Sequence, residues 1–289
     1  MAKKVLVTGG SGKLGNYVSP YLKERGYLVT NFDTKPSPPG SACETGKIPF
    51  VMGDITNLGD CMRAVAHAQP DVIVHLAAIP HHSEIQPAYS VEYDRENQAG
   101  ARFNQKLPED LTMRVNAMGT YYILDAARRM GVRQMVAASS YFVLGLGFRL
   151  SGTGYIPDYL PIDEDHVCAP EDTYSLSKYL GEEMQKAYAR AYGIKSVAFR
   201  LLGVYYPDSE EHRQVYQFDV QPPATGKSER GCIKTTTYQY VDARDVAIAT
   251  EQAMEAKGLG DFESFFLATD TLYSEPTVDV VQKHWTELR

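Results

Sequence analysis

The chain has 289 residues, a net charge of −7 and 44% hydrophobic residues. That length is enough for one large domain, or a core domain with a smaller partner, to bury a sizeable apolar core without disulfides. The acidic balance and the lack of a block of basic residues argue against a nucleic-acid partner. No run approaches the roughly 18 apolar residues of a membrane span, so we expect no membrane partner.

The four cysteines predict a reducing setting. They are scattered, with no Cys-x-x-Cys pair and no Cys/His cluster at zinc spacing, which predicts reduced thiols, a cytoplasmic protein and no metal site. The apolar run before Thr8 is also too short for the core of a signal peptide. The four are Cys43, Cys61, Cys168 and Cys232.

The first predicted strand, 5–8, leads into a glycine-rich stretch and then into helical spacing over 16–25. Gly10, Gly12 and Gly15 satisfy G-x-G-x-x-G between a strand and a helix. At such a place bare backbone N–H groups and a helix N-terminus hold the pyrophosphate of a dinucleotide. The stretch therefore predicts a dinucleotide-binding loop, with a glycine-rich turn that binds nothing as the alternative.

A second predicted strand, 27–32, is followed directly by Asp33, which comes 18 residues after Gly15. An acid near this offset accepts hydrogen bonds from the ribose hydroxyls and repels a 2′-phosphate, which favours NAD over NADP. Lys35 lies close by and favours a 2′-phosphate, so NADP stays open as the alternative.

The remaining pattern alternates near-continuous apolar strands with helices, which predicts an α/β fold, a Rossmann-type doubly wound parallel sheet. His75, on one buried strand, is expected to be packed rather than catalytic. Loops are expected over 35–47, 80–110, 145–172 and 205–236; for 80–110 a lid, a dimer contact and a mobile loop are all open. The further strands are expected at 48–52, 71–77, 134–138, 195–201 and 264–268, and the further helices at 57–68, 111–130, 173–192, 242–257 and 276–287.

We expect the chain to divide into two parts. A dinucleotide-binding domain covers 1–202, and 237–261 returns to it. A small, loop-rich substrate-binding part is built from 203–236 and 262–289. The chain ends soon after Trp285, which indicates either a reduced substrate-binding part or a chain cut short.

Tyr174 and Lys178 are four residues apart and so share one face of the predicted helix 173–192. Alone, this pair is also typical of a half-buried tyrosine beside a solvated lysine. Ser139 and Ser140 follow the strand 134–138, and ligands of open parallel sheets sit outside the carboxyl ends of the strands. A hydroxyl at that edge is therefore well placed to meet a substrate.

The order of these motifs resembles the extended short-chain dehydrogenase/reductases, the NAD-dependent epimerase/dehydratase family. The resemblance spans nearly the whole chain, and it is the combined pattern that is specific. It implies an NAD cofactor, a small-molecule substrate and a homodimer that pairs the helices 111–130 and 173–192. The motifs are Thr8-Gly9-Gly10-Ser11-Gly12-Lys13-Leu14-Gly15, Asp33, Asp54-Ile55, His75-Leu76-Ala77-Ala78, Asn116 with Gly119-Thr120, Ser139-Ser140, Tyr174 with Lys178, and Tyr240-Val241-Asp242.

The resemblance also implies roles for individual residues. Tyr174, Lys178 and a hydroxyl residue form the catalytic group. The family's hydroxyl lies five residues before a glycine, here Gly145, which selects Ser140 over Ser139. Asp54 and Ile55 are implied to face the adenine, and Ala77 and Ala78 the nicotinamide side. The implied cofactor site comprises Gly9, Gly10, Gly12, Lys13, Leu14, Gly15, Asp33, Asp54, Ile55, Leu76, Ala77, Ala78, Asn116, Tyr174 and Lys178.

The chemistry of these residue types fits such a role. Oxidation of a hydroxyl removes its proton while hydride leaves carbon. A phenol with an ordinary pKa of about 10 is protonated at neutral pH, so the pKa of Tyr174 must fall for it to act as the base. The Lys178 ammonium and a positive nicotinamide ring would both favour phenolate. Ser140 would hold the substrate oxygen as charge develops on it.

Two departures from the family narrow the reaction. Family dehydratases place Asp-Glu after the catalytic hydroxyl residue, whereas Tyr141-Phe142 follow Ser140, which argues against dehydration. Nucleotide-sugar members carry Asn-Val-Tyr-Gly-Pro after the sixth strand, whereas this chain reads Gly203-Val204-Tyr205-Tyr206-Pro207, closer to uronate and simple sugar dehydrogenases. We expect an NAD-dependent oxidoreductase acting on a sugar-like or other small polar substrate. A (nucleotide-)sugar 4-epimerase that keeps its NAD bound and a non-catalytic NAD(P)-sensing regulatory protein are the alternatives.

Overall fold

The computed structural model describes residues 2–81, 110–147, 151, 155, 157–215, 239–269 and 274–284. Seven strands form one sheet in the order β3-β2-β1-β4-β5-β6-β9. All of the neighbouring pairs run parallel. The strands of this sheet are β1 (Lys4–Thr8), β2 (Leu28–Asp33), β3 (Phe50–Met52), β4 (Val72–His75), β5 (Gln134–Ser140), β6 (Lys195–Leu201) and β9 (Phe262–Leu267).

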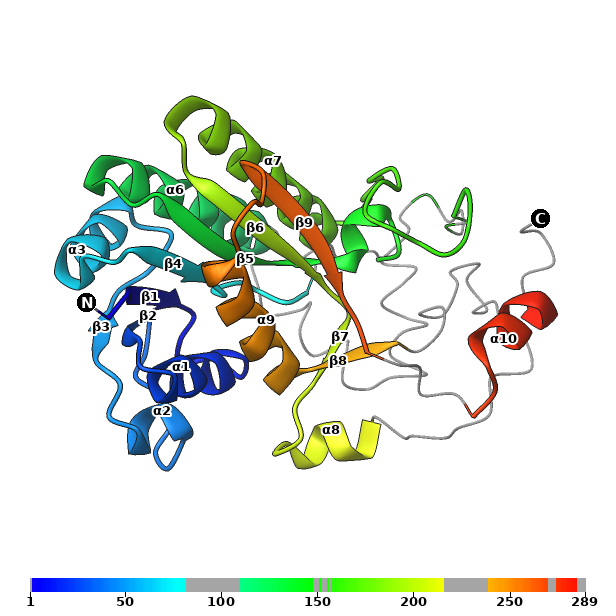
Figure 1. The fold of residues 1–289 in the computed structure, drawn as a ribbon, viewed down its shortest axis with the longest axis horizontal. Coiled ribbons are helices and arrows are strands. Elements are labelled where there is room, and N and C mark those ends of the chain that lie inside the picture. Colours follow the sequence, from blue (N-terminus) through cyan, green and yellow to red (C-terminus); the bar gives the residue numbers. More distant parts are fainter. Residues whose placement is uncertain are drawn as a thin grey trace.

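Helices cover both faces of the sheet (Figure 1). One face packs against α1 (Gly15–Glu24), α2 (Ala42–Thr45) and α9 (Ala243–Glu255). The other packs against α3 (Leu58–Ala68), α6 (Gly119–Met130) and α7 (Thr173–Tyr192). The α/β, Rossmann-type doubly wound parallel sheet expected from the sequence is confirmed.

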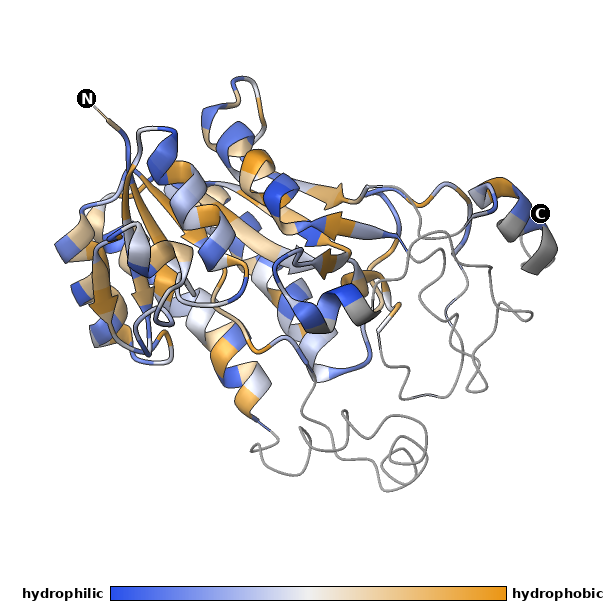
Figure 2. Cartoon of the chain, turned by 90° about the horizontal axis from the view of Figure 1, so that it is seen from below, coloured by the Kyte–Doolittle hydropathy of each residue, from blue (hydrophilic) through white to orange (hydrophobic). Residues whose placement is uncertain are grey.

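The sequence explains this layering. The central strands are apolar at successive positions, so side chains on both faces are buried, as a parallel sheet between two helical layers requires. Val5, Leu6 and Val7 of β1 are each at most 1% exposed. The strands are mainly hydrophobic in Figure 2, while the covering helices carry many hydrophilic residues. At the start of α7 the Asp172 carboxylate accepts a hydrogen bond from Ser175 N (2.9 Å), which caps the helix.

Three segments differ from the expectation. Residues 111–130 are helical, but Met113–Met118 forms a π-helical stretch before α6. Within 205–236, expected to be irregular, α8 (Glu210–Val215) follows β7 (Gly203–Tyr205), and β7 pairs with β8 (Tyr240–Asp242). A short helix, α2, lies in the expected loop 35–47 and is capped by Ser41. Short elements of this kind depend on distant pairing partners and single caps, which periodicity does not reveal.

The last strand bears on the expected division of the chain. Residues 262–289 were assigned to the substrate-binding part, but β9 pairs in parallel with β6 and is an edge strand of the large sheet. α10 (Thr277–His284) follows it. Most of the insertion expected over 80–110 lies outside the described residues, as do 216–238. None of the helices in the described ranges has the length and apolar character needed to span a bilayer.

Candidate active site

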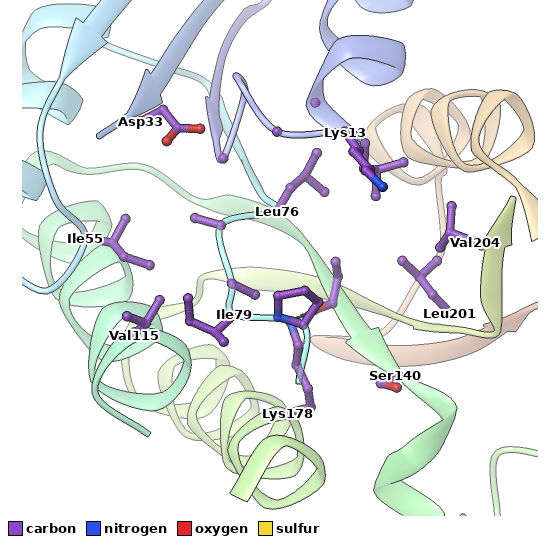
Figure 3. A pocket seen from close by; sticks show the side chains of 18 of the residues that line it. Lys13, Asp33, Ile55, Leu76, Ile79, Val115, Ser140, Lys178, Leu201 and Val204 are labelled. Carbon is purple, nitrogen blue, oxygen red and sulfur yellow. Dashed lines mark hydrogen bonds between the residues drawn. The ribbon is translucent and has the colours of Figure 1, made fainter. Parts of the chain in front are cut away.

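A cleft of about 770 Å³ lies at the carboxyl ends of the central strands. This is where open parallel sheets bind ligands, because the loops that leave the strands diverge there. In Figure 3, Lys13 and Asp33 lie on one side of the cleft and Ser140 and Lys178 on the other. The expected site residues that line it are Gly9, Gly12, Lys13, Leu14, Gly15, Asp33, Asp54, Ile55, Leu76, Ala77, Ala78, Ser140, Tyr174 and Lys178.

The glycine stretch has no room for side chains where it meets its neighbours. Gly9 has φ +71°, and a Cβ there would lie 2.6 Å from the backbone nitrogen of Ala77. A Cβ on Gly15 would lie 2.6 Å from the Cα of Gly10. The loop therefore rests directly on the segment that follows β4, and α1 begins directly against the loop.

Two of the expected cofactor residues lie away from the cleft. Gly10 faces the buried side chain of Asn31, whose Nδ2 donates to the Gly10 carbonyl (3.1 Å). The Asn116 amide accepts from Ile79 N (2.7 Å) and donates to Ile79 O (3.0 Å) and to Ser177 Oγ (3.0 Å). Asn116 thus ties the segment after β4 to α7. Its expected contact with a cofactor stays a prediction.

Asp33 ends β2 beside the glycine loop. Its carboxylate accepts hydrogen bonds from Ser11 N (3.1 Å) and Thr34 N (2.7 Å), which fix its direction at the cleft wall. Lys35 also lines the cleft. A crowded backbone loop with an acid at the end of the neighbouring strand is the arrangement that binds the pyrophosphate and ribose of a dinucleotide. These residues fit NAD, and Lys35 keeps NADP open.

At the other end of the cleft, the strand β5 and the helix α7 bring three expected catalytic side chains together. The Ser140 hydroxyl lies beside the Tyr174 phenol, whose pKa it lowers, and it accepts a hydrogen bond from Phe142 N (3.2 Å). Lys178 Nζ donates to the Ala138 carbonyl (2.8 Å) and lies 5.9 Å from the centroid of the Tyr174 ring. The phenol, the hydroxyl and the ammonium therefore line the same cleft.

Ser139 has a different partner from Ser140. Successive residues of a strand point to opposite faces, and the Ser139 hydroxyl donates to Glu182 Oε1 (2.6 Å). The geometry therefore supports the choice of Ser140 as the hydroxyl that faces Tyr174.

The two titratable groups of the site are shifted in opposite directions. Burial raises the pKa of Tyr174 to about 12, against the opposing effect of the Ser140 hydrogen bond and with a small contribution from Asp172. Burial lowers the pKa of Lys178 to about 8. Both side chains keep partial exposure at the cleft wall. The sequence predicts that Lys178 favours phenolate, but in the chain alone burial has the largest effect on the pKa of Tyr174 and Ser140 is the group that lowers it.

His75 is buried, as expected from its place on an apolar strand. Its Nδ1 lies 2.7 Å from Thr8 Oγ1 and its Nε2 lies 3.0 Å from Thr120 Oγ1. The Thr120 hydroxyl donates to Asn116 O (2.5 Å), so it must accept from a protonated Nε2. Burial and then the charge of Lys178 lower the pKa of His75 to about 3, which keeps the ring neutral.

Several cleft residues were not identified from the sequence. Phe142 meets the Tyr174 ring edge-on, at a centroid distance of 6.2 Å. Tyr206 lies between the Lys13 ammonium (5.9 Å from its ring centroid) and the His212 ring (4.9 Å). Phe142 could have been suspected from its place two residues after Ser140. Tyr206 belongs to the run after the sixth strand that departs from the family pattern, which was the available signal, whereas His212 lies in a segment without hydrophobic period and had none.

In the described part of the chain, no group of His, Cys, Asp and Glu side chains is arranged to hold a metal ion. The described cysteines, Cys43, Cys61 and Cys168, are free thiols.

Comparison with known proteins places this cleft in a family. Residues 5–265 match the model of the NAD dependent epimerase/dehydratase family. A putative UDP-glucose 4-epimerase of Methanocaldococcus jannaschii is 32% identical over 204 residues, which are 70% of this chain and 56% of that protein. A uronate dehydrogenase of Pseudomonas syringae pv. tomato is 27% identical over 212 residues, 73% of this chain and 63% of that protein. The chain thus matches less than two thirds of the length of these relatives.

Among solved structures, the fold is similar to that of the UDP-glucose 4-epimerase of Brucella ovis in complex with NAD. The TM-score is 0.67 at 24% identity, and the match covers 97% of this chain and 81% of that one. At this level of identity the likeness establishes the fold.

Proposed function

The chain belongs to the NAD dependent epimerase/dehydratase family, and on that premise we propose that it is an NAD-dependent oxidoreductase. It transfers hydride between the nicotinamide and a hydroxyl or carbonyl carbon of a sugar-like or other small polar substrate. One observation carries the proposal: Ser140 and Lys178 lie on one side of a cleft that Tyr174 also lines, and Lys13 of the glycine loop and Asp33 lie on the other.

The cofactor assignment rests on the crowded glycine loop and on the acid beside it. The loop backbone would hold the pyrophosphate, and the Asp33 carboxylate would accept hydrogen bonds from the ribose hydroxyls. When bound, NAD⁺ supplies the hydride acceptor and a positive charge.

Side chains of this protein bind the substrate oxygen and transfer its proton. In the direction of oxidation, Tyr174 removes the proton from the substrate hydroxyl, and in reduction it returns it. Ser140 donates a hydrogen bond to the substrate oxygen, where charge develops. Lys178, which is largely protonated at neutral pH with a pKa of about 8, stabilises the phenolate.

The raised pKa of Tyr174 sets a condition for its role as the base in oxidation. With a pKa raised to about 12 by burial, the phenol holds its proton at neutral pH in the chain alone. Deprotonation therefore requires added positive charge in the cleft. The positive charge of bound NAD⁺ would supply part of this.

Dehydrogenase action is the preferred form of the reaction. It is supported by the likeness to a uronate dehydrogenase and by the run Gly203-Val204-Tyr205-Tyr206-Pro207, which departs from the run of nucleotide-sugar members. A 4-epimerase that keeps NAD bound is the second candidate, supported by the names of the UDP-glucose 4-epimerase relatives. A non-catalytic NAD(P)-sensing protein is the third, and the presence of both Tyr174 and Lys178 argues against it.

The setting of the enzyme follows from the same reasoning. The free thiols favour a cytoplasmic protein. The chain would divide into a dinucleotide-binding domain, which includes β9, and a small substrate-binding part. Helices α6 and α7 would pair in a homodimer, because their outward side chains include exposed apolar residues such as Tyr121 and Tyr192, 40% and 44% exposed. Light scattering that gives the mass of one chain would refute the dimer.

The experiment that tests the function is an NADH-absorbance screen of the purified protein. Uronates, aldoses, polyols and nucleotide sugars are supplied with NAD⁺ or NADP⁺. Net formation of NADH supports the dehydrogenase. An isomerised product with copurified NAD and no net NADH selects the epimerase, and NAD binding without turnover of any of these substrates selects the sensing protein.

A further inference from the structure

A buried acid continues the catalytic face of α7. Tyr174, Lys178 and Glu182 recur every four residues and so form one stripe along the helix, called here the α7 stripe. Tyr174 and Lys178 line the cleft, whereas the Glu182 side chain is 0% exposed. A carboxylate at this depth is stable only when its charge is compensated.

Arg200 of β6 compensates that charge. Its Nε donates to Glu182 Oε1 (3.2 Å) and its Nη2 to Glu182 Oε2 (3.0 Å), and its own side chain is only 4% exposed. Burial disfavours the charged guanidinium, but Glu182 holds the pKa of Arg200 above its ordinary value. Breaking such a pair would leave one charge buried alone, so the two side chains stay together.

The α7 stripe is bound to three successive residues at the end of β5. Two of these contacts are hydrogen bonds, from Lys178 to the Ala138 carbonyl (2.8 Å) and from the Ser139 hydroxyl to Glu182 (2.6 Å). The third places Tyr174 beside the Ser140 hydroxyl, which lowers the pKa of Tyr174. The middle contact is the deepest one, and it lies next to Ser140 in the strand. Because Ser139 is held by a charged acceptor, the end of β5 cannot slide along α7 without breaking a short, charge-assisted bond.

Arg200 also reaches the segment that leads into α7. Its Nη1 donates to the Glu164 carbonyl (3.0 Å), and its Nη2 contacts Cys168 Sγ (3.5 Å). The Glu164 carboxylate in turn accepts from Phe266 N (2.7 Å) on β9. One guanidinium therefore joins α7, β6 and the segment on the substrate side of the cleft.

We propose that Glu182 and Arg200 are positioning residues that, through Ser139, hold the Ser140 hydroxyl in place beside the Tyr174 phenol. The inference rests on the proposed function for its catalytic consequence. Misplacement of reacting groups by about 1 Å costs up to about 100-fold in rate.

The test uses two variants and a matched control. Ser139→Ala removes the bond to β5 and leaves the buried ion pair intact. Glu182→Gln keeps the side-chain shape and removes the charge. The control is Glu183→Gln, the same change one residue further along α7, in an exposed ion pair with Lys186 (42% and 32% exposed).

With the best substrate from the screen, we expect Ser139→Ala and Glu182→Gln to lower kcat about 10- to 100-fold, with KM and NAD⁺ affinity nearly unchanged. The rising limb of the kcat–pH profile should move to higher pH, because a loosened Ser140 bond favours the protonated phenol. Hydrogen exchange of NAD-free protein should accelerate in peptides from β5 and from the first turns of α7. Glu183→Gln should match the wild type in each measurement.

Wild-type kcat and pH profile in folded Ser139→Ala would overturn the proposal, and this variant decides the matter if Glu182→Gln does not fold. If the wild-type protein turns over none of the substrates, the proposed function is refuted instead. In that case unchanged hydrogen exchange in Ser139→Ala overturns the positioning role, and faster exchange confined to those peptides supports it.

Discussion

Replacing Gly9 by alanine would test whether the glycine loop is as tightly placed as its geometry indicates. Gly9 has φ +71°, and an added Cβ would lie 2.6 Å and 2.7 Å from the backbone N and Cα of Ala77. These atoms belong to the segment that follows β4, so they cannot rotate away as a side chain would. Gly131 offers a matched control, because it has φ +78° and no atom within 4 Å of its added Cβ.

The two substitutions share one cost and differ in another. A left-handed alanine is strained by about 1–2 kcal/mol, and the stiffer unfolded chain offsets about 0.4–1 kcal/mol of this. Only Gly9→Ala adds a backbone collision, and overpacking of this kind typically destabilises by about 1–3 kcal/mol. We therefore expect Gly9→Ala to lower the free energy of unfolding by about 1–3 kcal/mol more than Gly131→Ala does.

Urea unfolding followed by circular dichroism measures both losses, and isothermal calorimetry measures the NAD⁺ affinity of the folded variants. A displaced loop should weaken NAD⁺ binding by Gly9→Ala at least about tenfold, equivalent to about 1.4 kcal/mol. Gly131 lies at the end of α6, so its variant should bind NAD⁺ like the wild type. Equal losses of stability in the two variants, or unchanged NAD⁺ affinity in Gly9→Ala, would refute this reasoning.

Two further predictions concern charge. The pKa of folded His75 is depressed to about 3, so below its unfolded value of about 6.5 only the unfolded state gains a proton, and stability falls as pH falls. Between about pH 7 and pH 5 this amounts to about 2 kcal/mol in urea unfolding, and a wild-type slope in His75→Gln would contradict it. Asp33→Ser should raise the affinity for NADP⁺ relative to NAD⁺ about tenfold in calorimetry by removing a like charge. Asp71→Ser, at the opposite end of the sheet, serves as its control, and an unchanged ratio in Asp33→Ser would exclude a role for Asp33 in choosing the cofactor.

Long elements with a clear period and a cap were predictable from the sequence. The bounds of α7 and β6 agree with the expectation residue for residue. Asp172 caps the helix and Gly193 ends it, and the strand is apolar except for Lys195, Ser196 and Arg200. The β7–β8 pair was not predictable, since each strand has three residues and depends on a partner far along the chain.

The candidate site, like the fold, was predictable only in part. The residue types and their order predicted the cleft, because the carboxyl ends of parallel strands converge on it. Glu182 and Arg200 were missed, since pairing a helix residue with a strand residue needs the packing distance between the two elements. The available sequence signal for this pair was Arg200, the one arginine in the mainly apolar strand β6. The direction of the Tyr174 pKa shift was also missed, because sequence spacing places an ammonium nearby but does not give the depth of burial.

The most direct test of the proposed mechanism compares one hydroxyl-to-hydrogen change at two places on α7. NADH formation is measured for the wild type, for Tyr174→Phe and for Tyr192→Phe, together with NAD⁺ affinity. We predict that Tyr174→Phe lowers kcat at least about 100-fold while it binds NAD⁺ like the wild type, and that Tyr192→Phe retains full activity. Wild-type turnover by Tyr174→Phe would contradict the assignment of this phenol as the acid and base of the reaction.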